Sequence, residues 1–275
     1  MTSLNNITQQ IRLDILEMTT VAGSGHPTSS LSAVEIIVGL FFGENGKYFK
    51  SDLEDFSSLE NDRIIFSKGH ASPLFYALYK ALGVLNHDQI LEFRKFESSL
   101  EGHPTPRFEF TEATTGSLGM GLGIGLGIAL ANRIDNSPAK VFVLLGDSEM
   151  AEGSNWEAMQ LASYYKMQNI IGIIDINRLG QRGETMEAWD LDTYRAKCLA
   201  FGWEVFVCEE GNNLESVIET FEKVYLSNTS KPKMILAKTK KGAGISFLED
   251  KLNWHGKVLN QAQFAAAKSE LENKV

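Results

Sequence analysis

Uninterrupted apolar runs alternate with helical patterns in the second half of the chain, and this alternation constrains the fold more than any other feature. The clearest runs are 140–145 (KVFVLL) and 170–176 (IIGIIDI), and two more lie at 203–208 and 234–239. Strands that read as continuous hydrophobic runs are buried on both faces, as in parallel sheets covered by helices. We therefore predict an α/β fold whose parallel sheet carries helices on both faces.

The rest of the chain predicts helices around one more strand. A short apolar run at 63–66 reads as a buried strand. A glycine-rich run at 118–131 reads as a buried helix, because a membrane span takes about 20 residues. Further helices are expected over 7–18, 32–42, 73–82, 154–166 and 261–275. No repeat, low-complexity tract or linker divides the sequence, so we expect a single domain over 1–275.

Charge and composition exclude several classes of protein. The 275 residues include 26 Lys and Arg against 35 Asp and Glu, giving a net charge of −9. Such a chain lacks the basic surface that binds nucleic acid or anionic membranes. Cys198 and Cys208 have no metal-like spacing and are too few for a disulfide scaffold. Because the polar N-terminus carries no signal-peptide pattern, we expect a cytoplasmic protein without nucleic-acid or membrane partners.

Polar residues follow two consecutive predicted strands. Asp147 follows the strand at 140–145, and Asn177 follows the strand at 170–176. A βαβ unit returns these two strand ends side by side, so a carboxylate and an amide would face one crevice. Such hard oxygen ligands suit Mg²⁺ or Ca²⁺, and Mg²⁺ commonly completes its shell with phosphate oxygens and water. Either residue alone is more simply a helix cap or an Asx turn, but the pair favours a metal–diphosphate site.

Four of the five histidines lie next to glycine in loop-like segments, namely His26, His70, His103 and His255. One Gly-His pair is most simply a solvated loop. Four pairs suggest a shared polar pocket, because glycine permits close approach and histidine both donates and accepts hydrogen bonds near neutral pH. None of these histidines has the spacing of a zinc site.

A glycine-rich turn at 114–119 opens the run that extends to residue 131. The amide groups of such a turn can cradle phosphate. The small, apolar face of the run permits close packing across a subunit interface, and a flexible linker is the alternative. Lys241, in a glycine turn after the last strand, is either a phosphate contact or part of an ordinary basic turn. The dinucleotide-binding, P-loop and G-x-S-x-G signatures are absent from the sequence.

Together these segments resemble the N-terminal half of transketolase, the diphosphate-binding domain of a thiamine diphosphate enzyme. The resemblance follows the chain in order through 24–28 (SGHPT), 67–71 (SKGHA), 102–104 (GHP), 115–119 (TGSLG), 146–147 (GD), 175–181 (DINRLGQ), 241–242 (KG) and 254–256 (WHG). A Gly-Asp pair with a later Asn is typical of thiamine diphosphate enzymes in general. The four histidine segments narrow the resemblance to the transketolase branch.

The resemblance implies a role for each group of residues, with thiamine diphosphate and Mg²⁺ as cofactors and Ca²⁺ or Mn²⁺ as substitutes for the metal. The metal ligands would be Asp147, Asn177 and the carbonyl of Leu179. The contacts to the cofactor would be Ser29, His70, Gly116, Ser117, Leu118, Gly146, Asp147, Ser148, Asn177, Lys241 and His255. The catalytic histidines would be His26, His70, His103 and His255. Glu152 resembles a buried interface glutamate that links two cofactor sites in catalysis.

The sequence departs from the family pattern in two ways. The family usually has glycine where this chain has Ser148, and serine would be strained if that position requires a positive φ. In addition, no segment after Gly256 resembles the pyrimidine-binding domain, whose glutamate activates the cofactor. The resemblance therefore implies one subunit of a split transketolase, with a C-terminal subunit that carries the pyrimidine-binding domain as its partner.

The activity implied is transfer of a two-carbon ketol unit from a ketose phosphate to an aldose phosphate, as in the pentose phosphate pathway. We expect a heterotetramer that self-associates through the glycine-rich helix. Two alternatives stay open. One is a related split ketol-transferase that acts on a sulfosugar or a biosynthetic intermediate, and the other is a non-catalytic regulatory protein that binds the cofactor. The complete set of four histidines argues against the second alternative.

Overall fold

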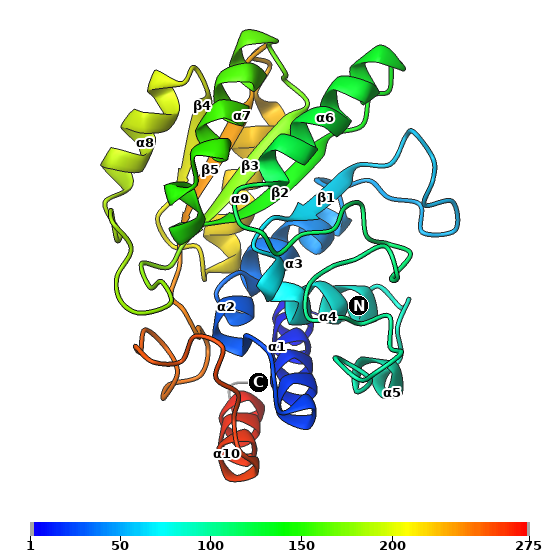
Figure 1. Cartoon of the computed structure of the whole chain (residues 1–275), viewed down its shortest axis with the longest axis vertical. Helices are drawn as coiled ribbons and strands as arrows, with labels where there is room; N and C mark the ends of the chain where they lie inside the picture. Colours follow the sequence, from blue (N-terminus) through cyan, green and yellow to red (C-terminus); the bar gives the residue numbers. More distant parts are fainter. Residues whose placement is uncertain (1–2, 274–275) are drawn as a thin grey trace.

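Five parallel strands form the centre of the computed structural model, which describes residues 3–273 (Figure 1). They are β1 (Arg63–Phe66), β2 (Val141–Gly146), β3 (Ile170–Ile176), β4 (Glu204–Cys208) and β5 (Lys233–Lys238). Their spatial order is β1-β2-β3-β5-β4, and every neighbouring pair is parallel. All seven residues of β3 are buried, as the uninterrupted apolar run predicts. The predicted α/β class with a parallel sheet is confirmed.

Helices cover both faces of the sheet and form two separate cores (Figure 1). One face is covered by α6 (Gly121–Ile134), α7 (Gly153–Tyr164) and α8 (Leu191–Ala200). The other is covered by α1 (Leu4–Ala22), α3 (Val34–Phe42), α4 (Ser72–Ala81) and α9 (Leu214–Leu226), with α2 (Pro27–Leu31), α5 (His87–Ile90) and α10 (Gln261–Glu272) beyond them. Alternate residues of β2 divide between the cores: Val143 packs toward α6, and Phe142 packs on the opposite side.

Some element boundaries differ from those expected. The helix expected from residue 118 begins at Gly121, because Gly116 and Gly119 adopt φ values of 132° and 84° and make residues 116–120 a turn. The segment 32–42 contains α3 only from Val34, after a break that follows α2. The helix expected over 261–275 is α10, and residues 274–275 lie outside the described part of the chain.

Four helices, α2, α5, α8 and α9, are additional to those expected from apolar spacing. Side-chain caps mark where three of them begin. Asn86 accepts from the Gln89 amide at α5, Asp190 from the Thr193 amide at α8, and Asn213 from the Ser216 amide at α9. Such capping residues are the sequence signal for these helices. Over residues 3–273, none of the helices has the length and hydrophobicity needed to cross a bilayer.

Candidate active site

Loops from both halves of the chain converge on a cavity of about 390 Å³ at the carboxyl ends of the central strands. This edge is where open parallel sheets bind ligands. The lining residues are His26, Ser29, Lys68, His70, His103, Gly116, Leu118, Gly146, Asp147, Ser148, Glu149, Asn177, Leu179, Gln181, Lys241 and His255. The cavity thus brings together all the site residues predicted from the sequence except Ser117 and Glu152.

Ser117 and Glu152 are both exposed on the surface of this chain. Glu152 lies where η3 (Ser148–Ala151) ends and α7 begins, and its resemblance to a glutamate buried at a subunit interface stays a prediction about the assembly. Burial of this carboxylate would require a second chain. Ser148 begins η3 and is not among the residues with positive φ, so serine is unstrained at a position where the family usually has glycine.

The Asp147 carboxylate is buried between two strand ends. It accepts hydrogen bonds from the backbone amides of Ser148 at 2.8 Å and Arg178 at 2.6 Å. Burial, followed by the nearby negative charge of Asp175, raises the pKa of Asp147 to about 7. A buried carboxylate with a raised pKa is stabilised by a cation, which restores its charged form. The position and environment of Asp147 therefore fit a metal ligand.

Two further oxygens complete the candidate ligand set. The Asn177 side-chain oxygen accepts from the Leu179 amide at 3.2 Å, and its amide group donates to Asp175 at 3.2 Å. The Leu179 carbonyl accepts from the Lys241 ammonium at 2.7 Å, which leaves one of its two lone pairs. Carboxylate, amide and carbonyl oxygens are the ligand types that Mg²⁺ and Ca²⁺ use, with open positions left for phosphate and water.

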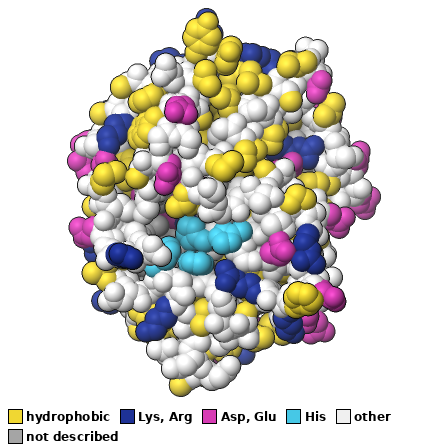
Figure 2. Space-filling model, viewed as in Figure 1, with side chains coloured by type: hydrophobic (Ala, Val, Ile, Leu, Met, Phe, Trp, Pro, Cys, Tyr) yellow, Lys and Arg dark blue, Asp and Glu magenta, His cyan; other side chains and the backbone are white. Residues whose placement is uncertain are grey.

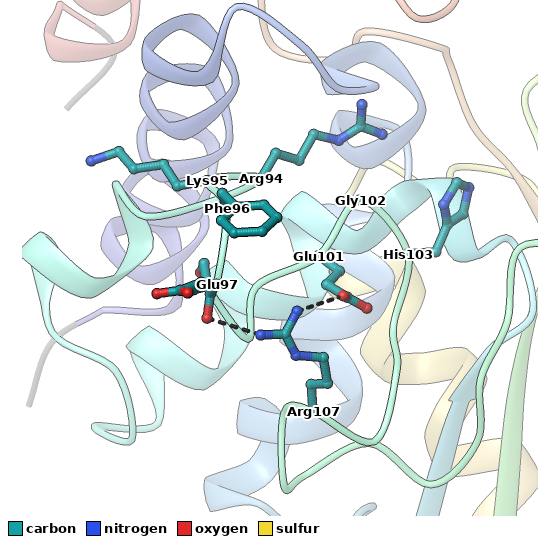
Figure 3. A pocket seen from close by; sticks show the side chains of 9 residues that line it. Arg94, Lys95, Phe96, Glu97, Glu101, Gly102, His103 and Arg107 are labelled. Carbon is teal, nitrogen blue, oxygen red and sulfur yellow. Dashed lines mark hydrogen bonds and ion pairs between the residues drawn. The ribbon is translucent and has the colours of Figure 1, made fainter.

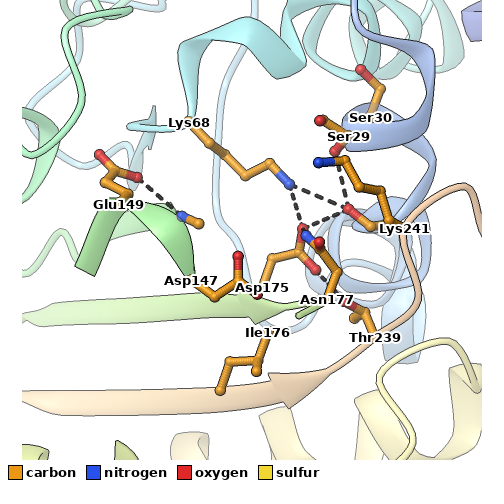
Figure 4. Close-up of polar contacts among 12 residues, drawn as sticks. Ser29, Ser30, Lys68, Asp147, Glu149, Asp175, Ile176, Asn177, Thr239 and Lys241 are labelled. Atoms are coloured by element: carbon orange, nitrogen blue, oxygen red, sulfur yellow. Dashed lines mark hydrogen bonds and ion pairs between the residues drawn. The ribbon is translucent and has the colours of Figure 1, made fainter. Parts of the chain in front are cut away.

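A buried ion pair between Lys68 and Asp175 fixes the floor of the cavity (Figure 4). Asp175 also accepts from the hydroxyls of Ser32, at 2.6 Å, and Thr239. Although burial alone would raise the pKa of Asp175, these partners hold it below its ordinary value. The pair joins the end of β3 to the segment after β1, so it holds Asn177 and His70 in fixed positions relative to each other.

Three of the four predicted histidines form one cluster (Figure 2). The ring centroids of His26 lie 5.1 Å from His70 and 5.0 Å from His255, and those of His70 and His255 are 5.4 Å apart. His103 lies across the cavity mouth against Gly116, where an added Cβ would lie 2.8 Å from the His103 ring. A side chain at that glycine would displace the histidine.

Burial and neighbouring positive charges keep the histidines neutral. Burial is the largest cause, and it lowers the pKa of His26 and of His255 to about 4 and the pKa of His70 well below its ordinary value. The His103 pKa is lowered for the same reason, assisted by Arg94. Neutral imidazoles can each donate one hydrogen bond and accept another at neutral pH.

Two buried polar atoms at the cavity have no hydrogen-bond partner among the described residues: the Ser29 hydroxyl and Nδ1 of His26. Buried polar atoms are normally satisfied, so these two are positioned for a polar ligand. The Ser29 hydroxyl, together with the oxygen set around Asp147, fits a diphosphate-bearing cofactor with its metal, and His26 Nδ1 is available to a polar substrate.

A second, more open cavity of about 740 Å³ lies on the outer side of His103 (Figure 3). Arg107 on its rim forms an ion pair with Glu101 at 3.0 Å, and the Arg94 guanidinium donates to the Ser24 hydroxyl at 2.6 Å. Phe96 on the same rim is 96% exposed. The two cavities have His103 in common, so they adjoin at this histidine.

Three lining residues were not predicted from the sequence: Lys68, Glu149 and Gln181. Lys68 and Gln181 lie inside motif segments that were noted for their other residues, and Glu149 comes two positions after Asp147. The sequence signal that could have identified them is that each is a polar residue close to a strand-end motif.

Comparison with known proteins establishes the family. The family model for the thiamine diphosphate binding domain of transketolase matches residues 3–274. This chain belongs to the transketolase family. Transketolase from Homo sapiens is 42% identical over 258 residues, which cover 94% of this chain and 40% of that protein. The chain therefore spans about 40% of the length of the curated transketolases that it matches.

Other members of the transketolase family differ in how much of their length is matched. One of the subunits of apulose-4-phosphate transketolase from Actinobacillus succinogenes is 37% identical over 264 residues, which cover 96% of this chain and 93% of that protein. The structure of transketolase from Leishmania mexicana matches with a TM-score of 0.90 at 26% identity, covering 99% of this chain and 42% of that chain. For transketolase from Campylobacter jejuni the TM-score is 0.86 at 29% identity, with 98% and 42% covered.

Proposed function

We propose that this chain is the diphosphate-binding subunit of a transketolase that moves a two-carbon ketol unit from a ketose phosphate to an aldose phosphate. The observation that carries the proposal is the convergence of four neutral histidines with Asp147 and Asn177 on one cavity. A regulatory protein that only binds the cofactor would not need the histidines. The described residues share one sheet, so we also propose that they form a single domain.

The residues of the cavity divide into two groups by chemistry. Asp147, Asn177 and the Leu179 carbonyl would hold the divalent metal, and Ser29, Ser148 and Lys241 would hold the diphosphate. Gly116, Ser117 and Leu118 would border the cofactor rings. When bound, thiamine diphosphate supplies a nucleophilic carbon that accepts the two-carbon unit.

The histidines would act on the sugar. His26, His70 and His255 lie within ring contact of one another, and their neutral state lets each donate a hydrogen bond to one hydroxyl or carbonyl and accept from another. Positioned imidazoles can also take a proton from a hydroxyl and return it as the carbon–carbon bond breaks or forms. The test is an assay of the assembled enzyme with thiamine diphosphate, Mg²⁺ and an aldose phosphate. It measures the rate at which a ketose phosphate is consumed.

The same site is compatible with a more specialised sugar substrate. This second candidate is favoured by the nearly complete overlap with the relative named for apulose-4-phosphate, against 40% coverage of the human transketolase. A panel of common and branched ketose phosphates, assayed with one acceptor, distinguishes the two. A preference of at least tenfold in kcat/KM for one donor decides between them.

We propose that a separate C-terminal subunit supplies the pyrimidine-binding domain. The relative from Actinobacillus succinogenes is named as one subunit of its enzyme, which implies a second subunit in that protein. On this chain, Glu152 and Ser117 are exposed beside the cavity, as expected if a partner covers them. Two copies of each chain in a closed two-fold assembly would complete both sites at once.

We expect this chain to have no ketol-transfer activity when purified alone, and to gain it when mixed with its partner subunit. The physical reason is that the cofactor carbon must lose a proton, and the acid–base group that promotes this loss would come from the partner. The measurement is the steady-state rate with and without a titrated partner. Turnover by the single chain at the rate of the mixture would refute the split-subunit proposal.

The outer face of α6 offers a sharp test of where subunits meet. Gly125 packs into the sheet, where an added Cβ would lie 2.6 Å from Val143, whereas Gly123 and Gly127 are exposed with open space beside them. Hydrophobic side chains gather over α6 and α7 (Figure 2). Tyr164, the last residue of α7, is exposed. An obligate interface usually buries more than about 2,000 Å², and this face is where we place it.

We therefore expect Gly127→Leu to stabilise the isolated chain while preventing assembly. A helical glycine replaced by leucine gains up to about 1 kcal/mol in helix propensity, but the added side chain would hold the partner away. Thermal unfolding and light scattering measure the two effects, with Gly127→Ala as a control that adds only a methyl group. Assembly at full strength by Gly127→Leu would exclude α6 from the interface.

A further inference from the structure

Glu149 is a buried carboxylate beside the cavity, and neither metal binding nor sugar binding requires it. Its side chain is 1% exposed. One oxygen accepts from the Ser67 hydroxyl and from the Gly119 amide at 2.8 Å, and the other accepts from the Gly146 amide at 3.0 Å. A single side chain therefore binds three chain segments that are far apart in sequence.

Each of the three segments carries candidate site residues. Ser67 directly precedes the segment of Lys68 and His70, Gly119 ends the turn that carries Gly116 and Leu118, and Gly146 directly precedes Asp147. The Ser67 oxygen in turn accepts from the Gly121 amide at 3.1 Å, which extends the contact to the first residue of α6. The Glu149 carboxylate is thus the common attachment point of the histidine, ring-binding and metal-binding segments.

The turn at 116–119 has particular need of such an attachment, because it belongs to no helix or strand. Its last residue is held through both of its backbone polar groups: the Gly119 amide donates to Glu149, and the Gly119 carbonyl accepts from the Ser154 hydroxyl at 2.9 Å. The Glu149 residue is itself fixed, since its carbonyl accepts from the Asn155 side chain at 2.8 Å.

We infer that Glu149 is a positioning residue. Its carboxylate holds the turn at 116–119 in a fixed position relative to His70 and Asp147, so that the cavity is shaped for thiamine diphosphate before the cofactor binds. This inference rests on the proposed function of the cavity. Glutamate suits the role because an ionised carboxylate is acceptor-only and can serve three donors at once. Glutamine of the same size has one acceptor oxygen, and its NH₂ group would face a backbone N–H.

The test is Glu149→Gln in the full chain with its partner subunit. We expect faster hydrogen exchange, by at least tenfold, at the amide of Gly119 or Gly146 in the absence of cofactor. We also expect a loss of about tenfold in affinity for Mg²⁺–thiamine diphosphate, within the range seen when outer-shell partners of metal sites are removed. Calorimetry and mass spectrometry of peptides spanning 113–121 and 142–148 are the measurements.

Controls separate positioning from a general loss of stability. Val224→Ala in α9 destabilises the opposite core and should leave both readouts unchanged, and Glu209→Gln changes an exposed glutamate. Ser154→Ala removes the other attachment of the same residue and should raise exchange at Gly119 even if Glu149→Gln does not fold. Unchanged exchange and affinity in Glu149→Gln would overturn the inference, whereas no cofactor binding by the unsubstituted complex would overturn the proposed function beneath it.

Discussion

Asp147→Ala is expected to lower the affinity for Mg²⁺–thiamine diphosphate by more than about 100-fold, because losing a ligand exceeds the 10–100-fold typical of its outer-shell partners. The metal-free chain should fold as before. The carboxylate that is removed is buried, and its pKa is raised to about 7, so the substitution takes away a charge that burial disfavours. Cofactor affinity should therefore fall, whereas the stability of the metal-free chain should rise.

Calorimetry on the assembled complex and thermal unfolding of the metal-free chain measure these two responses. Asn177→Ala should also weaken binding, although it removes the bonds to Leu179 and Asp175 as well. Asp192→Ala is a matched control, since Asp192 is an exposed aspartate in the first turn of α8. Normal cofactor binding by both Asp147→Ala and Asn177→Ala would favour the simpler interpretation, in which Asp147 caps a helix and Asn177 makes a turn.

Most of the sheet could be predicted from the sequence because burial on both faces leaves a direct mark on it. The runs at 140–145 and 170–176 have almost no polar residue, and they coincide with β2 and β3 within one residue. The helices α8 and α9 were harder because their caps, Asp190 and Asn213, are ordinary polar residues until the structure shows which amides they bind.

The metal and histidine residues could be predicted because strand ends and Gly-His pairs are local patterns. The contacts that support them could not. Lys68 and Asp175 are 107 positions apart in the sequence, and neither residue by itself indicates an ion pair. The fold brings them together at the carboxyl ends of the strands β1 and β3. Glu149 likewise binds Ser67, which is 82 positions away. Burial of such charges is costly unless each is paired, and pairing is a property of the tertiary structure.

The sequence also does not show which single residues are exposed on the surface of this chain. Glu152 lies in the segment that the sequence places at the site, yet its side chain is on the surface of this chain. Gly123 and Gly127 belong to the same run as Gly125, but only Gly125 packs into the sheet. Whether a residue is covered depends on the assembly, and one chain's sequence pattern describes only its own core.

The histidines give the second large effect that we expect. His26→Ala and His103→Ala should each lower kcat by about 10²- to 10⁴-fold, the usual contribution of a positioned acid–base group. Affinity for the cofactor should change only a few-fold. Within the described residues, neither ring is hydrogen-bonded to Asp147, Asn177 or Lys241. The interactions lost are those made with the sugar, so kcat and kcat/KM should fall together.

His87 provides the control for these variants. It lies on α5 with half of its side chain exposed, outside both cavities, so His87→Ala should keep full activity. The low pKa of His26, about 4 because burial disfavours its charge, adds a second criterion. The histidine stays neutral as the pH falls through 6.5, so its function should persist there and be lost only as the pH nears 4. A variant that loses cofactor affinity and turnover equally would place its histidine against the diphosphate instead of the sugar.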